Sequence, residues 1–187
     1  LLPKVGWSKI FEANQDEQKS ATLIRNLSRL KSPIPMTACQ TLKSQTFKTA
    51  RDHTRDALID ILHRSKCLTP QELEQEAIQG TRSAILLKAR QTKDPNAYFL
   101  KRLQSNKRQE AARVCEALIR APELVNALTP KVGIATAIAK HLRTTKDSFP
   151  FLRLLTMMVK SSQPVDRIRM ESVLIPALKP YIDGRAG

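Results

Sequence analysis

The side chains best suited to chemistry in this sequence are basic and lie in the segment 91–120, QTKDPNAYFLKRLQSNKRQEAARVCEALIR. An aromatic pair in this segment is followed by two basic doublets: Tyr98-Phe99, then Lys101-Arg102 and Lys107-Arg108. The intervening Ser105-Asn106 predicts a short break, so the doublets would flank an elbow between two helices. Clustered cations with aromatic neighbours are typical of a surface that contacts phosphates.

Basic residues near other helix ends extend this candidate interface. We predict nucleic-acid contacts by Lys88, Arg90, Lys93, Lys101, Arg102, Lys107, Arg108, Arg113, Arg143 and Lys146. A further set at helix ends and links could form one ridge with the last two of these residues: Arg153, Lys160, Arg167 and Arg169. The alternative is that Tyr98 and Phe99 are core residues and that the doublets are merely solvated, because Glu110 and Glu116 offset part of the charge.

No pattern in the sequence indicates catalysis. A phosphate-binding loop needs a second glycine and a lysine that Gly80-Thr81-Arg82 lacks, and neither GxGxxG nor HExxH occurs. His141 has no nucleophile partner marked by the sequence. His53 and His63 have no cysteine or carboxylate at ligand spacing around both. We therefore predict a protein that is not an enzyme and has no cofactor and no metal site.

The strongest compositional signal is charge. The net charge is +15 and the isoelectric point is near 10.2, with the excess spread evenly: residues 1–93 hold 16 basic and 9 acidic side chains, and residues 94–187 hold 16 and 8. Such an excess favours a polyanionic partner, because each phosphate contact releases condensed counterions. An anionic membrane surface is a second possible partner, and charge that only keeps the protein dispersed is the plain alternative.

The cysteines and the hydropathy pattern bear on location. Cys39, Cys67 and Cys115 are odd in number and far apart, and predict neither a disulfide scaffold nor a structural metal site. A reducing intracellular compartment is therefore expected, whether cytoplasm, nucleus or organelle matrix. No apolar run is long enough for a transmembrane segment. The chain begins at Leu1 rather than Met, as a processed or trimmed product would.

Helices are the elements that must position these residues. Only five glycines occur and aromatic residues make up 4%, which disfavours a β-sandwich or barrel. Thr69-Pro70 with Glu72 is typical of a capped helix start, and Asp94-Pro95 repeats the device. The expected helices in the first half are a turn with Trp7, Ile10 and Phe11, then 16–31, one long helix over 37–66, and 69–93 with a break near Gln79-Gly80-Thr81.

From Ala121 onward, prolines restart short helices at regular intervals. These begin near Pro122, Pro130, Pro150 and Pro164; the last reaches Ile182 with an interruption at Pro176, and Asp183-Gly184 ends it. The run FPFLRLLTMMV is apolar nearly all round and should lie between neighbours, with Met157 and Met158 in the core. Residues 107–183 resemble HEAT- or armadillo-type helical repeats, although no fixed period aligns. The resemblance implies stacked helix pairs that present an extended surface to a partner.

The sequence thus predicts an all-α protein. It is either one irregular helical bundle or an N-terminal bundle (1–93) joined to a basic, helical-repeat-like region (94–187). We predict a non-catalytic, basic nucleic-acid-binding subunit of a larger assembly that makes sequence-independent phosphate contacts, with RNA favoured over DNA and with other protein subunits as partners. The alternatives are a helical scaffold that binds a partner helix or an acidic segment, and a duplex-DNA-binding protein.

Overall fold

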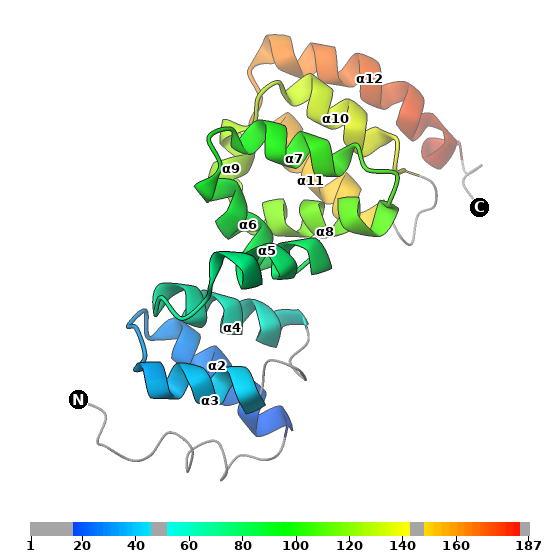
Figure 1. Ribbon diagram of the computed structural model, residues 1–187. Helices are drawn as coiled ribbons and strands as arrows, with labels where there is room; N and C mark the ends of the chain where they lie inside the picture. Colours follow the sequence, from blue (N-terminus) through cyan, green and yellow to red (C-terminus); the bar gives the residue numbers. More distant parts are fainter. Residues whose placement is uncertain (1–16, 46–51, 143–147, 184–187) are drawn as a thin grey trace. The chain divides into compact units, whose positions relative to one another are not determined.

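The computed structural model describes residues 17–45, 52–142 and 148–183. These residues form eleven helices and no strand (Figure 1). The predicted all-α fold is therefore confirmed. The predicted turn with Trp7, Ile10 and Phe11 lies outside the described residues.

The chain divides into two compact units, which we call unit 1 (residues 1–84) and unit 2 (residues 85–187). The helices of unit 1 are α2 (Glu17–Arg29), α3 (Met36–Gln45), α4 (Asp52–Arg64) and α5 (Pro70–Gln79). The unit boundary falls between Ala84 and Ile85 within α6 (Arg82–Gln91), nine residues before the expected limit at 93/94. Unit 2 continues with α7 (Pro95–Leu103), α8 (Arg108–Ile119), α9 (Pro122–Ala127), α10 (Lys131–Ala139), α11 (Phe149–Lys160) and α12 (Pro164–Ile182).

The core of unit 1 forms where α2 and α4 pack side by side, with α3 against them (Figure 1). Ile24 and Leu27 lie one turn apart on α2, so both point to the same side of the helix. They meet the apolar face of α4, which includes Leu58 and Leu62, and Leu42 of α3 joins the same cluster. Burial of these amphipathic faces therefore forms the hydrophobic core of the bundle.

The single long helix expected over residues 37–66 is wrong. Along one continuous helix, the 28 residues between Cys39 and Cys67 would span about 42 Å. Their Cα atoms are 6.2 Å apart, because α3 and α4 are separate helices that place these two residues side by side. The expected stripe residues Phe47 and Ala50 lie outside the described residues.

Local capping signals correspond to helix ends. The Thr69 hydroxyl accepts from the Glu72 amide at 3.2 Å, and the Glu72 carboxylate accepts from the Thr69 amide at 2.8 Å, which completes the predicted capping box. Asp94 caps α7 by accepting from the Ala97 amide at 3.0 Å. The predicted break near residues 79–81 is confirmed: Gly80 ends α5 with φ at 89°, a left-handed conformation that glycine adopts without steric cost.

Unit 2 is built from two layers of helices (Figure 1). One layer contains α7, α10 and α12, with α10 packed against both others. The other contains α8 and α11, and α9 packs against both. Helices α8, α9 and α11 therefore pack together on one side, and α7, α10 and α12 on the other.

Two details of the C-terminal helices differ from expectation. Helix α11 packs against α8, α9 and α10, and Met158 is buried, but Phe149 is 64% exposed, so the helix is not covered all round. Helix α12 continues through Pro176 rather than being interrupted there. Proline has no backbone N–H, so the Ser172 carbonyl, four residues before Pro176, loses its helical hydrogen bond. Both residues are exposed, so water can replace that bond.

Candidate nucleic-acid interface

The predicted elbow is the link between α7 and α8. Helix α7 ends at Leu103 and α8 begins at Arg108, as the Ser105-Asn106 break predicts. The Ser105 hydroxyl donates to Glu110 Oε2 at 3.0 Å and accepts from the Lys107 amide at 3.2 Å. These bonds fix the path of the link, so the residues on it are held in a defined arrangement.

Arg102 is part of the internal structure of the elbow. Its side chain is 10% exposed, and Nε donates to Glu110 Oε1 at 3.1 Å. Nη1 donates to the Tyr98 hydroxyl at 2.8 Å, and the guanidinium lies 5.6 Å from the centre of the Tyr98 ring. Arg102 therefore joins α7 to α8 and has little surface left for a ligand.

The aromatic pair belongs to the packing of unit 2. Phe99 is fully buried, and Tyr98 is half-buried with its ring in an edge contact to Phe99 at 5.6 Å. Arg102 lies over the Tyr98 ring and donates to its hydroxyl, so Tyr98 and Phe99 both take part in internal contacts of unit 2.

Arg108 is also structural. Nε donates to the His141 carbonyl at 3.0 Å, Nη2 lies 3.4 Å from the Ser148 hydroxyl, and the guanidinium is 5.3 Å from the centre of the Phe151 ring. The buried His141 ring stacks on Phe151 at 5.5 Å. His141 Nε2 lies 2.8 Å from the Leu103 carbonyl, which can only accept, so Nε2 carries the proton. Arg108 and His141 together bind the start of α8 to α10 and α11.

Two further predicted arginines make surface ion pairs. Arg90 lies 2.9 Å from Glu123, and Arg113 lies 3.1 Å from Glu116 one turn along α8. Exposed pairs of this kind contribute little to stability, and their arginines can exchange partners. Lys88 is half-buried on α6.

Three of the predicted contact residues remain as exposed lysines near the ends of α7: Lys93 before it, Lys101 in its last turn and Lys107 on the elbow. Arg143 and Lys146 lie outside the described residues. Among the described residues of the predicted set, the three lysines and Arg90 are exposed, Lys88 and Arg113 are half-buried, and Arg102 and Arg108 are engaged within the fold.

The predicted list omitted several exposed cations of unit 2. Within the described part of unit 2, the exposed basic residues are Arg90, Lys93, Lys101, Lys107, Arg120, Lys140, Arg153, Lys160, Arg167, Arg169 and Lys179, and the exposed acids are Asp94, Glu123, Glu171 and Asp183. Lys140 and Lys179 could have been found from sequence by one signal: each lies near the end of a helix, where a cation is favoured by the helix dipole.

Helix α12 also has an exposed apolar stripe. Val165, Ile168 and Ile175 are all exposed, and at 100° per residue they fall on one side of the helix, away from the buried Met170 and Leu174. This second face could not be predicted from the sequence, because apolar residues spread around a helix do not reveal which side its neighbours cover.

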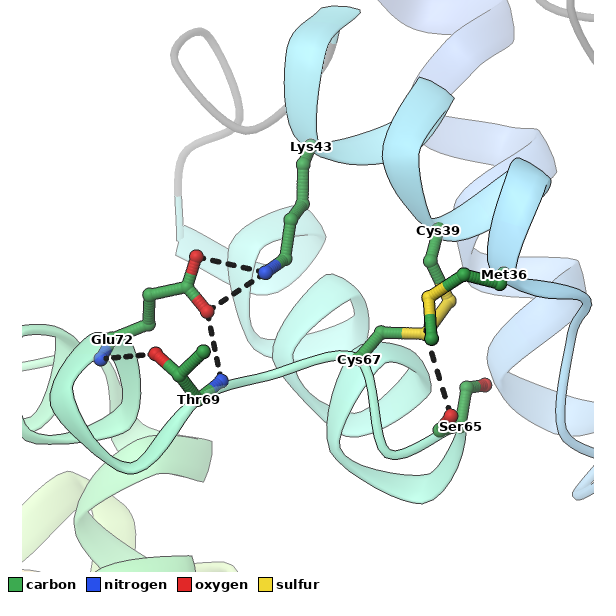
Figure 2. Close-up of polar contacts among 7 residues, drawn as sticks. All are labelled: Met36, Cys39, Lys43, Ser65, Cys67, Thr69 and Glu72. Atoms are coloured by element: carbon green, nitrogen blue, oxygen red, sulfur yellow. Dashed lines mark hydrogen bonds and ion pairs between the residues drawn. A yellow bond between two sulfur atoms is a disulfide. The ribbon is translucent and has the colours of Figure 1, made fainter.

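The cysteines of unit 1 depart from expectation. Cys39 of α3 and Cys67, just after α4, form one disulfide, which the number and spacing of the cysteines had not predicted (Figure 2). The thioether of Met36 lies 3.8 Å from the Cys67 sulfur. Residues from separate helices approach each other here through tertiary packing, which sequence spacing could not indicate. A disulfide does not by itself identify a compartment.

Unit 1 also contains inward-facing ion pairs. Glu76 is 2% exposed and accepts from Arg55 Nε at 2.8 Å and from the Thr81 hydroxyl at 2.7 Å. Asp56 is buried, accepting from Arg82 Nε at 2.8 Å and from the amide of Ser83 at 3.1 Å. The hydrogen bond with Glu76 raises the pKa of Arg55 against the opposing effect of burial.

A third pair joins α3 to the start of α5 (Figure 2). Lys43 Nζ lies 2.8 and 2.7 Å from the two carboxylate oxygens of Glu72. Burial acts to raise the pKa of Glu72, but hydrogen bonds from Lys43 and Thr69 outweigh it, so the pKa lies below its ordinary value. The same carboxylate therefore serves as a helix cap and as a link between helices.

Within the described residues, no group of three or more His, Cys, Asp or Glu side chains converges as a metal site, and no helix is long and apolar enough to cross a membrane. No protein family, curated protein or solved structure matches this chain at a significant level.

Proposed function

We propose that this chain is a non-catalytic subunit that binds a nucleic acid, with RNA favoured over DNA, through sequence-independent phosphate contacts. The observation that supports this most is the segregation of charge in unit 2, whose exposed surface carries many more lysines and arginines than acids. Lysine is a mobile point charge suited to phosphates in no fixed geometry. Each contact displaces condensed counterions from the nucleic acid and strengthens binding.

The elbow between α7 and α8 is the place where we expect binding to be strongest. Arg102 and Arg108 hold the elbow in position from inside, and Lys101 and Lys107 extend from it into solvent. Cations on a fixed support lose less entropy on binding than cations on a mobile loop. RNA is favoured over duplex DNA because basic helical proteins without a groove-reading motif are common in ribonucleoprotein particles.

The test is fluorescence anisotropy of the full chain with labelled single-stranded RNA, duplex RNA and duplex DNA across a series of salt concentrations. We expect the chain to bind RNA. The logarithm of its association constant should fall linearly with the logarithm of salt concentration, with a slope of several units. Tighter binding to duplex DNA would favour the duplex-DNA alternative, and absence of binding to all three at low salt would contradict the proposal.

A second function, a scaffold for a partner protein, is favoured by the apolar stripe of α12. Val165, Ile168 and Ile175 are exposed on one face over about three turns of α12, with Ser172 between Ile168 and Ile175. The exposed Arg169, Lys179 and Glu171 border this stripe, and exposed cations outnumber exposed acids over the described part of unit 2, so the occupant that we propose is an acidic amphipathic helix of a partner.

This second proposal is tested by titrating the chain with an acidic amphipathic helical peptide and with its basic counterpart. We expect the acidic peptide to bind and Ile168→Asp to abolish that binding. Ser172→Asp is the matched control, because it adds the same charge to the same face without removing apolar surface. Equal loss of binding in both variants, or preference for the basic peptide, would contradict the assignment.

A further inference from the structure

Three sulfur atoms gather at one edge of unit 1 (Figure 2). Cys39 and Cys67 are paired, and Met36 lies over them with its thioether 3.8 Å from the Cys67 sulfur. Met36 is 60% exposed, whereas both cysteines are buried. An exposed methionine against a covered cysteine pair is not needed for packing, because Met36 leaves most of its side chain in water.

The backbone holds these sulfurs in place. Met36 and Cys39 are three residues apart in the first turn of α3, so they share one face of the helix. Cys67 lies beyond the end of α4, where its amide donates to the Leu62 carbonyl at 2.8 Å and the preceding Lys66 has φ at 57°. A helix-ending turn thus carries Cys67 back toward α3, and the arrangement does not depend on the disulfide alone.

The spacing fits a metal bound by three sulfurs. Metal–thiolate bonds are about 2.3 Å long, so three sulfurs in a plane around one ion lie about 4 Å apart. The distance from Met36 to Cys67 is already close to this value. Once the disulfide is opened, rotation of the cysteine side chains about χ1 separates their sulfurs without a movement of the backbone.

We propose that the reduced chain binds one Cu(I) ion through the thiolates of Cys39 and Cys67 and the thioether of Met36. Soft thiolate and thioether donors favour Cu(I), which three sulfurs can satisfy. Structural Zn²⁺ requires four nitrogen, sulfur or oxygen ligands, and no third His, Cys, Asp or Glu joins the pair in the described residues. The exposed Met36 gives copper a route to the buried cysteines.

Formation of the site takes two balanced steps. A dithiol reductant breaks the Cys39–Cys67 bond, transferring two electrons and two protons to the cysteines while it forms its own disulfide. Cu(I) then replaces both thiol protons, which pass to water, and accepts a lone pair from the Met36 sulfur. No electron moves in the second step, so the metal stays Cu(I).

The first experiment reduces the full chain with dithiothreitol, removes the reductant without air, and titrates Cu(I) against a coloured Cu(I) chelator. We expect one Cu(I) per chain, no binding by the oxidised chain and no binding by Cys39→Ser. Met36→Leu retains the size and apolarity of the side chain but loses the sulfur. We expect its affinity for Cu(I) to fall at least roughly tenfold, the loss that follows removal of a residue that supports a metal site. Cys115→Ser should bind as the parent does, because Cys115 is buried in unit 2.

Three results would overturn this site. Equal copper uptake by Cys39→Ser would place the metal elsewhere, and unchanged affinity in Met36→Leu would remove the thioether from the site. Zn²⁺ bound as tightly as Cu(I) would contradict the selectivity. Far-UV circular dichroism of the reduced chain provides an independent check: we expect helix content to persist, and copper bound only by an unfolded chain would exclude a preorganised site.

Discussion

Units 1 and 2 use their charged residues in opposite ways. In unit 1, the acids Asp56 and Glu76 are buried and bind arginines from neighbouring helices. In unit 2, the acids are few and the exposed lysines lie at helix ends. Unit 1 holds 13 basic and 9 acidic side chains and unit 2 holds 19 and 8, so the excess of positive charge that is even between residues 1–93 and 94–187 is uneven between the units. Net charge predicts the class of partner, but the burial of each side chain shows which charged groups are accessible to that partner.

The same comparison applies within the elbow. Lys101-Arg102 and Lys107-Arg108 are equivalent doublets in sequence, yet in each the arginine is half-buried and the lysine is exposed. The planar guanidinium can bridge a carboxylate, a carbonyl and an aromatic face at once, whereas ammonium groups are more strongly hydrated. This chemical difference explains why the arginines became part of the fold.

The largest expected effect tests the buried charges of unit 1. Asp56→Asn removes the carboxylate that pairs with the mostly buried Arg82 guanidinium, so we expect a loss of about 3–5 kcal/mol in the free energy of unfolding. Asp60→Asn, one turn along α4 and exposed, should cost less than about 1 kcal/mol. Urea denaturation followed by circular dichroism measures both, and equal costs would contradict a structural role specific to Asp56.

A smaller effect tests the division within unit 2. Arg108→Gln removes the bonds to the His141 carbonyl and Ser148 and the contact with Phe151, and should cost about 1.5–3 kcal/mol of stability. Lys101→Gln removes the same charge from an exposed site and should change stability by less than about 0.5 kcal/mol. Urea denaturation measures both variants. Equal losses in the free energy of unfolding would contradict the distinction between structural arginines and exposed lysines.

The smallest effect on stability depends on pH. The folded-state pKa of Glu72 lies below its ordinary value of 4.5, so its carboxylate contributes stability above about pH 4.5 that is lost as the pH falls through the folded-state pKa. Glu72→Gln should therefore be less stable than the parent at pH 7, by under about 1 kcal/mol for this part-exposed pair, with the difference vanishing in acid. Thermal unfolding from pH 3 to 7 measures this, and a difference that grows in acid would contradict the assigned sign.

Local sequence predicted local structure well. The Thr69 capping box, the Asp94 cap, the Gly80 break and the Ser105 break all follow from residues within one turn of each other. Such interactions are decided by neighbours along the chain, so they can be read before the fold is known.

Contacts between distant residues could not be predicted in this way. The partners of Arg108 lie 33 and 40 residues away, and the Cys39–Cys67 bond joins residues 28 apart. From the sequence we predicted surface arginines and distant cysteines. Their true partners could not be recognised, because side chains in different helices meet only after the helices pack. The nucleic-acid interface therefore stays a prediction, within which the structure distinguishes exposed lysines from arginines that bind other parts of the fold.

The central claim, that exposed lysines of the elbow bind phosphates, is tested most directly by the salt dependence of RNA binding in two double variants. Lys101→Ala with Lys107→Ala should weaken binding and reduce the log–log salt slope by about 1.4 for single-stranded RNA, since each lost contact removes about 0.7. Lys140→Ala with Lys179→Ala removes the same charge from other exposed sites of unit 2 and should change the slope less. Equal slopes in both variants and the parent would contradict a binding surface at the elbow.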